Sequence, residues 1–139
     1  MNRGKDRLSF SVNGHATALV NEGMINMGKG RDQIDLVTGL LAGEGTIKLG
    51  PGNDLFSGFG QQGMLNGGKG TDQLRLPTGR YELRPEGKRW RITRDERTMV
   101  ISNIETIGSQ QTPEGSLLRI KDLDQPSTLI IDESGISLT

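Results

Sequence analysis

Three short stretches of this chain repeat one glycine-spaced pattern that ends in an aspartate followed closely by an apolar residue. They read MGKGRDQI from residue 27, LGPGNDLF from residue 49 and GGKGTDQL from residue 67. Glycine adopts positive φ angles more freely than any other residue, so two glycines two positions apart predict a tight turn. A chain that uses one turn three times is expected to fold from repeating units.

The turns belong to a longer repeat. Residues 21–41 and 61–81 are identical at 11 of 21 positions. An apolar residue also recurs every nine residues, an interval that a flexible glycine-rich linker would not maintain. These residues are Ile47, Phe56, Leu65, Leu74, Leu83, Ile92 and Ile101, and Ile25 and Ile34 keep the same interval four residues out of step. The change of step predicts an insertion of four residues within 36–42.

Each nine-residue unit predicts a turn followed by a very short strand whose middle residue points inward. Two units return the chain to its starting side and so make one coil. Stacked coils place equivalent residues about 4.8 Å apart. Because one coil cannot bury its apolar residues alone, the core forms between stacked coils. The sequence therefore predicts an all-β solenoid.

The aspartates of the three turns, Asp32, Asp54 and Asp72, are expected on the same side of successive coils. Neighbouring carboxylates about 5 Å apart would repel each other by roughly 3 kcal/mol at an effective dielectric constant near 20. Such a column favours bound cations, and oxygen ligands without histidine or cysteine suit a hard cation, calcium before magnesium. Three stacked turns leave two gaps, so we expect about two ions.

The three stretches resemble the hemolysin-type calcium-binding repeat, or RTX repeat, whose pattern is G-G-x-G-x-D-x-U-x. The resemblance covers about residues 19–76. It implies a right-handed parallel β-roll with calcium held between the turns of successive coils, and side-chain ligands from the three aspartates. It implies backbone carbonyl ligands from Gly28, Gly30, Arg31, Gly50, Gly52, Asn53, Gly68, Gly70 and Thr71.

The match departs from the family pattern in both sets of turns. Met27 and Leu49 replace the first glycine, and Pro51 stands inside a turn. The turns on the opposite side have no aspartate at the sixth position, and Glu22 and Glu44 fall at the fifth, where the family uses a carbonyl. These opposite turns are residues 21–23, 43–45 and 61–63. We therefore expect calcium on one side of the roll only.

The chain is expected to form three consecutive parts. Residues 1–18 predict an N-terminal cap, either a strand or a hairpin around Asn13-Gly14, a preferred two-residue turn. Residues 19–79 are expected to form the calcium-binding roll, and residues 80–139 to continue the strands into a C-terminal cap. In this last part, larger side chains take the position of the aspartate and are expected to point inward. They are Tyr81, Trp90 and Met99.

Residues 75–97 carry eight basic side chains against four acidic ones. The basic residues are Arg75, Arg80, Arg84, Lys88, Arg89, Arg91, Arg94 and Arg97. One interpretation is a face, made of Arg80, Arg84, Arg89 and Arg91, that binds an anionic polysaccharide or a cell surface. The other interpretation is that these arginines are the outward residues of strands whose inward residues form the core.

Composition limits the other classes of function. Seventeen basic and 17 acidic residues give zero net charge, so no overall field favours nucleic acid. The chain has no cysteine, which excludes thiolate metal sites. It has one histidine and no nucleophile motif, so we expect no enzyme. It has no apolar run near 18 residues, which predicts no transmembrane segment. Its polar start lacks the apolar core of a cleaved signal peptide.

Three functions fit these features. The first is a calcium-dependent folding module of a secreted bacterial protein, for which the resemblance implies type I secretion without an N-terminal signal peptide. The second is a module in which calcium stiffens a surface that binds an anionic polysaccharide, or an adhesin segment. The third is a structural solenoid that needs no metal.

Overall fold

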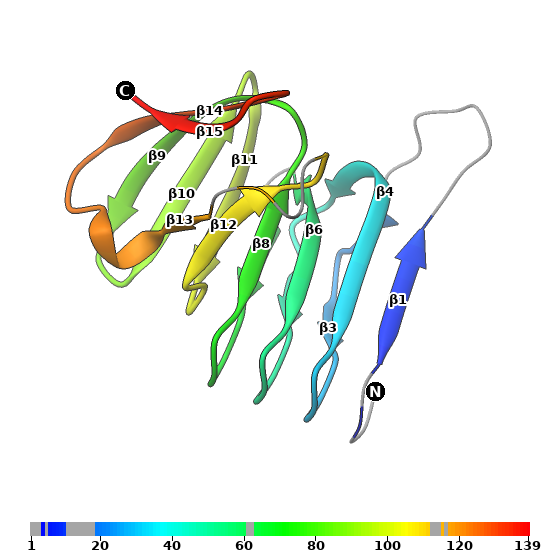
Figure 1. Cartoon of the computed structure of the whole chain (residues 1–139). Coiled ribbons are helices and arrows are strands. Elements are labelled where there is room, and N and C mark those ends of the chain that lie inside the picture. Colours follow the sequence, from blue (N-terminus) through cyan, green and yellow to red (C-terminus); the bar gives the residue numbers. More distant parts are fainter. Residues whose placement is uncertain (1–3, 5, 11–18, 61–62, 112–114, 116) are drawn as a thin grey trace.

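The computed structural model of the chain describes residues 4, 6–10, 19–60, 63–111, 115 and 117–139. The protein is all-β and consists of two sheets (Figure 1). The first sheet contains β1 (Arg7–Phe10), β2 (Leu19–Val20), β4 (Gln33–Ala42), β6 (Leu55–Gly60), β8 (Gln73–Leu76), β12 (Thr106–Ser109) and β13 (Leu118–Arg119). The second contains β3 (Met24–Asn26), β5 (Thr46–Lys48), β7 (Gly63–Asn66), β9 (Gly79–Glu86), β10 (Arg89–Arg94), β11 (Arg97–Ser102), β14 (Ser127–Asp132) and β15 (Gly135–Leu138). A short 3-10 helix, η1 (Ile120–Asp122), follows β13, and no helix in the described residues is long and apolar enough to cross a membrane.

The chain alternates between the two sheets from β3 to β8. The strands β3, β5 and β7 are neighbours in the second sheet, and β4, β6 and β8 are neighbours in the first, with every pair parallel. Equivalent apolar residues face each other across these pairs: Phe56 lies opposite Leu74, and Ile47 opposite Leu65. The turns that join the sheets are therefore repeated in one orientation.

The apolar residue of each nine-residue unit lies in the interior, as the repeat predicts. Eight of these residues are almost completely buried in one continuous core, and Ile25 is partly buried against it. The eight are Ile34, Ile47, Phe56, Leu65, Leu74, Leu83, Ile92 and Ile101. Phe59 and Tyr81 add an edge-to-face contact with ring centroids 5.2 Å apart.

Three of the four inserted residues lie within β4. The register between β4 and β6 shifts between Asp35, which is opposite Ser57, and Leu40, which is opposite Phe59. A bulge of this kind takes up extra residues in one strand while the pairing on either side of it continues. The prediction of an insertion within 36–42 is confirmed for three of its four residues, and the fourth lies between Leu41 and Thr46.

After β8 the chain forms antiparallel strands. The second sheet continues from β11 through β10, β9 and β14 to β15, each pair antiparallel. Tyr81 and Met99 are buried there and Trp90 is partly buried, as predicted. The nine-residue interval persists because Leu83 faces Ile92 across a hairpin rather than across stacked coils. The chain then returns to the alternating arrangement, since β11 is parallel to β7 and β12 is parallel to β8.

Of the two alternatives for the N-terminal cap, the described residues form strands and not a hairpin. Both β1 and β2 pair in parallel with β4, so they run in the same direction, whereas the arms of a hairpin run in opposite directions. The predicted turn, Asn13-Gly14, lies outside the described residues. The physical reason is that β1 follows a glycine turn of its own and extends the parallel ladder of the repeat.

Candidate metal site

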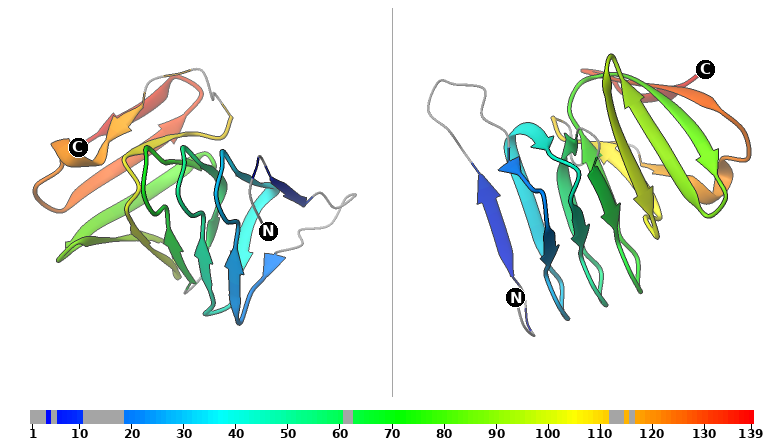
Figure 2. Two further views of the ribbon diagram at one scale, coloured as in Figure 1. Left: turned by 90° about the horizontal axis from the view of Figure 1, so that it is seen from below. Right: turned by 180° about the vertical axis from the view of Figure 1, so that it is seen from behind.

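The three glycine turns lie side by side along one edge of the molecule, at the bottom of Figure 1. They connect β3 to β4, β5 to β6 and β7 to β8, each leading from the second sheet to the first. Figure 2 shows the same stacked turns from behind. All six glycines predicted as turn positions have positive φ angles: Gly28, Gly30, Gly50, Gly52, Gly68 and Gly70.

Glycine is also required in these turns because successive turns approach each other closely. A Cβ on Gly52 would lie 1.7 Å from the carbonyl oxygen of Gly30, and a Cβ on Gly70 would lie 1.9 Å from that of Gly52. A Cβ on Gly30 would lie 1.5 Å from the carbonyl oxygen of Gly4. The second glycine of each turn thus leaves room for a main-chain carbonyl of the preceding turn.

The aspartates of the turns form a column linked by hydrogen bonds. The main-chain N–H of Asp32 donates to Oδ1 of Asp54 at 2.7 Å, and that of Asp54 donates to Oδ1 of Asp72 at 2.8 Å. The column continues at both ends, where Asp6 N–H donates to Asp32 Oδ1 at 2.8 Å and Asp72 N–H donates to Glu105 Oε2 at 2.7 Å. The predicted alignment of three aspartates is therefore part of a column of five acidic residues.

Asp6 and Glu105 were missed by sequence reasoning, although each has a signal. Asp6 follows Gly4 by two residues and precedes Leu8 by two, as the pattern requires, but Asn2 stands where the pattern has its second glycine. Glu105 also precedes an apolar residue, Ile107, by two positions, but the turn before it is shorter than the glycine turns and contains no glycine. These substitutions hide both positions from a search for the glycines.

One oxygen of each aspartate in the column is buried without a hydrogen-bond donor in the described part of the protein. These atoms are the Oδ2 oxygens of Asp6, Asp32, Asp54 and Asp72. Asp32, Asp54 and Asp72 are only 1%, 3% and 0% exposed. A buried charged oxygen without a partner destabilises the fold strongly, so it calls for a positive ligand or a proton.

Main-chain oxygens beside the column also lack hydrogen bonds from the described residues. The hydrogen bonds between successive turns use the carbonyls of Pro51 and Lys69, which accept from Gly30 and Gly52. Within the described chain, no hydrogen bond uses the carbonyls of the glycines predicted as ligands in the first two turns. They are Gly28, Gly30, Gly50 and Gly52. Pro51 fits its turn because the position needs a carbonyl, not an N–H.

The fifth residue of each turn places its side chain outside the column. Arg31, Asn53 and Thr71 are exposed, and Asn53 Oδ1 accepts a hydrogen bond from the main-chain N–H of Thr71 at 2.9 Å. Only their carbonyls are therefore suited to face an ion. No group of three acidic or histidine side chains converges on one point among the described residues. An ion in a gap would need carboxylates from adjacent turns together with main-chain carbonyls.

The electrostatics of the column favour a bound positive charge. Burial raises the pKa of Asp32, Asp54 and Asp72 above the ordinary value, and the pKa of Asp72 is raised to about 7. Main-chain N–H donors oppose this shift, and the negative charges of neighbouring acids add to it, including Glu105 beside Asp72. Without a cation, the column holds protons at a pH where ordinary aspartates have lost them.

The raised pKa predicts how the stability of the metal-free protein changes with pH. The folded state binds more protons than the unfolded chain between about pH 4, the unfolded value, and about pH 7. We expect the free energy of unfolding to fall as pH rises through this range. Urea unfolding at pH 5, 6, 7 and 8 in metal-free buffer measures this slope. Asp72→Asn should flatten it, and an equally steep slope in that variant would contradict the assignment.

The turns on the opposite side are built differently. The Asn21 side chain accepts a hydrogen bond from Gly23 N–H at 3.1 Å and donates to the carbonyl of Thr46 at 3.2 Å. An asparagine amide thus joins neighbouring coils by itself. Glu22 and Glu44 are exposed, and Glu22 Oε2 accepts from the main-chain N–H of Glu44 at 3.3 Å. This arrangement supports the expectation that a cation column would lie on one side only.

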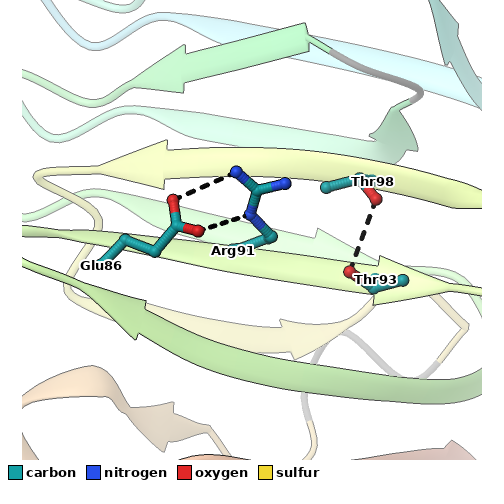
Figure 3. A network of polar contacts seen from close by, with 4 residues as sticks. All are labelled: Glu86, Arg91, Thr93 and Thr98. Carbon is teal, nitrogen blue, oxygen red and sulfur yellow. Dashed lines mark hydrogen bonds and ion pairs between the residues drawn. The ribbon is translucent and has the colours of Figure 1, made fainter.

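The predicted basic face lies on the outer surface of β9 and β10. Its four arginines are exposed, while Tyr81, Leu83 and Ile92 on the same strands are buried. Two of the four are paired with acids: Arg91 contacts Glu86 at 2.7 and 3.3 Å (Figure 3), and Arg80 contacts Glu82 at 3.7 Å. The four are Arg80, Arg84, Arg89 and Arg91. Strand alternation accounts for their positions.

Comparisons of the chain with protein-family models, with curated proteins and with solved structures find no match. The resemblance to hemolysin-type repeats rests on the residues of the turns.

Proposed function

We propose that this chain is a calcium-binding β-roll module, similar to the hemolysin-type repeats, that folds or is stabilised when calcium enters the aspartate column. The observation that carries the proposal is the set of buried Oδ2 oxygens without hydrogen-bond donors. They lie in stacked turns whose glycine carbonyls also accept no hydrogen bond from the described residues. Both kinds of oxygen are ligands that calcium prefers.

Calcium suits this donor set better than other common metals do. Zinc and the later transition metals favour histidine and cysteine ligands, which the turns do not contain. Magnesium requires a rigid octahedral shell and keeps several waters, whereas calcium accepts six to eight oxygens in irregular geometry. Because Asp6 extends the column beyond Asp32, four aspartates leave three gaps, and we propose three ions where the sequence alone predicts about two.

Coupling to folding follows from the same charges. In the absence of calcium, the carboxylates of the column must either stay protonated or repel one another. A ligand that binds only the folded state adds its binding free energy to the stability of that state. We propose that the module belongs to a secreted bacterial protein, exported by type I secretion, and gains stability in extracellular calcium. No catalytic residue is part of this proposal.

The test is a calcium titration of the metal-free protein followed by circular dichroism and thermal unfolding. At calcium concentrations 100 times the dissociation constant, each site adds about 2.7 kcal/mol. Three sites should therefore raise the unfolding midpoint by roughly 20 °C. The same concentration of magnesium should give a much smaller change. A spectrum and midpoint that are indifferent to calcium would favour the metal-free solenoid instead.

A second candidate function is binding of an anionic polysaccharide or cell surface by the face of Arg80, Arg84, Arg89 and Arg91. Two of these arginines, Arg84 and Arg89, are exposed and have no ion-pair partner among the described residues. Exposed charges of this kind favour a solvated surface as much as a ligand. A double variant, Arg84→Gln with Arg89→Gln, tests this candidate through its affinity for the polysaccharide.

A further inference from the structure

A groove of about 510 Å³ runs across the outer face of the first sheet, directly beside the aspartate column. Its floor is formed by the residues that come directly after each acidic residue of the column, at the start of the strands. These residues are in register across five strands: Arg7, Gln33, Leu55, Gln73 and Thr106. Neighbouring strands lie about 4.8 Å apart, so the groove offers a side chain at each step of an extended ligand.

Arg75 enters this groove from β8 and has an unsatisfied donor. Its neighbours in register are Ser57 on β6 and Gly108 on β12. A Cβ on Gly108 would lie 2.9 Å from Nε2 of Gln73 and 2.9 Å from Cδ2 of Leu117, so the missing side chain leaves room for these two residues beside Arg75. The Nε–H of Arg75 is buried and has no acceptor within the described residues.

An unpaired donor of a charged group is costly when it is buried, which points to an acceptor that arrives from outside. The guanidinium presents a planar fork that matches a carboxylate in bidentate geometry. The amides of Gln33 and Gln73 and the hydroxyl of Thr106 line the groove around it. Such groups hydrogen-bond the hydroxyls of a sugar, and Arg7 and Arg31 add positive charge along the groove.

The acids of the groove decide when an anion can enter. Asp6, Asp32, Asp54 and Asp72 also line it, and their charges repel an anion while they are ionised and free of metal. Arg7 is partly neutralised, because it contacts Asp35 at 3.5 Å. Calcium ions held by these aspartates would offset their negative charge. Anion binding at Arg75 therefore depends on calcium, and this inference rests on the proposed function.

We propose that this groove binds a carboxylate-bearing, linear saccharide, with one carboxylate held by Arg75 and neighbouring hydroxyls held by the polar row of the sheet. The site is separate from the arginine face of β9 and β10, which lies on the second sheet. Arg75 differs from those arginines because its unsatisfied donor is buried within a groove, whereas they are exposed on a strand surface.

The experiment uses calcium-loaded protein, with a hyaluronan hexasaccharide as the acidic probe and maltohexaose as the neutral one. Calorimetry gives the affinity, and the Nε–Hε resonance of Arg75 reports contact at the groove. We expect the acidic probe to bind and to shift this resonance. Arg75→Gln should weaken binding at least tenfold without changing the calcium titration. The matched control, Arg84→Gln with Arg89→Gln on the other sheet, should bind as the wild type does.

Each other outcome overturns the proposal in a distinct way. Calcium binding without any saccharide binding would refute the groove and leave the calcium function standing. Loss of binding in the control variant but not in Arg75→Gln would move the site to the arginine face. Equal binding of maltohexaose would exclude a role for the carboxylate, and saturation by sodium glucuronate alone at equal affinity would exclude a linear chain. Absence of calcium binding, seen first by circular dichroism, would remove both proposals.

Discussion

Asp54→Asn is expected to abolish most of the stabilisation of this protein by calcium. Asp54 lies in the middle of the column, with Asp32 and Asp72 on either side, so its carboxylate borders two gaps. Each site is worth about 2.7 kcal/mol at a calcium concentration 100 times its dissociation constant. Loss of two sites should therefore remove about 5 kcal/mol of the free energy of unfolding gained from calcium.

The same substitution should have the opposite effect when calcium is absent. Asparagine keeps an Oδ1 atom that can accept from Asp32 N–H, and it removes a buried charge whose Oδ2 has no donor among the described residues. It also removes the repulsion between Asp54 and its two neighbours. We expect Asp54→Asn to be at least as stable as the wild type in metal-free buffer. Urea unfolding with chelator and with millimolar calcium separates the two effects.

Glu44→Gln is the matched control for this experiment. Glu44 is an exposed acid in a turn of the same coil, on the side where Asn21 joins the coils instead of an aspartate. Its substitution removes the same formal charge and should leave the calcium effect unchanged. If Glu44→Gln lost the calcium effect as well, or if Asp54→Asn kept it, ions would not be held in the aspartate column.

The repeated part of the fold could be predicted from the sequence because one interval determines both the core and the column. An apolar residue every nine positions can be buried in stacked short strands, and this fixed the interior positions of residues such as Phe56 and Leu74. The alignment of the aspartates follows from the same interval, since Asp54 and Asp72 are 18 residues apart, which is two nine-residue units. The bulge of β4 followed from the change of step.

Other parts could not be predicted because their patterns have two structural solutions. In β9 and β10 the interval of nine fits a hairpin as well as a coil, and Leu83 faces Ile92 in the hairpin. Asn13-Gly14 is a strong hairpin signal by itself, but the strands beside it both joined the parallel ladder of β4. Asp6 was hidden because its turn has only one of the two glycines. Beside the groove, Gly108 leaves room for Gln73, which lies 35 positions away in the sequence.

Gly52→Ala is expected to be among the most destabilising single substitutions in this chain. Gly52 has a φ angle of +141°, and a Cβ there would lie 1.7 Å from the carbonyl oxygen of Gly30. The backbone strain alone costs about 1–2 kcal/mol. Separation of two packed turns adds about 1–3 kcal/mol more, for a loss of about 2–5 kcal/mol in the free energy of unfolding. Urea unfolding in calcium measures this loss.

Gly135→Ala separates the steric requirement of the stacked turns from backbone strain. Gly135 has a φ angle of +117°, but a Cβ there would meet no atom within 4 Å. The free energy of unfolding of this variant should therefore fall only by the cost of backbone strain, about 1–2 kcal/mol. Gly52→Ala should also weaken calcium binding, because the carbonyl of Gly30 must move away from its turn, while Gly135→Ala should leave calcium affinity unchanged. Equal losses of stability in the two variants would mean that the turns are not held in close contact in solution, and the column of main-chain carbonyls would then lose its structural basis.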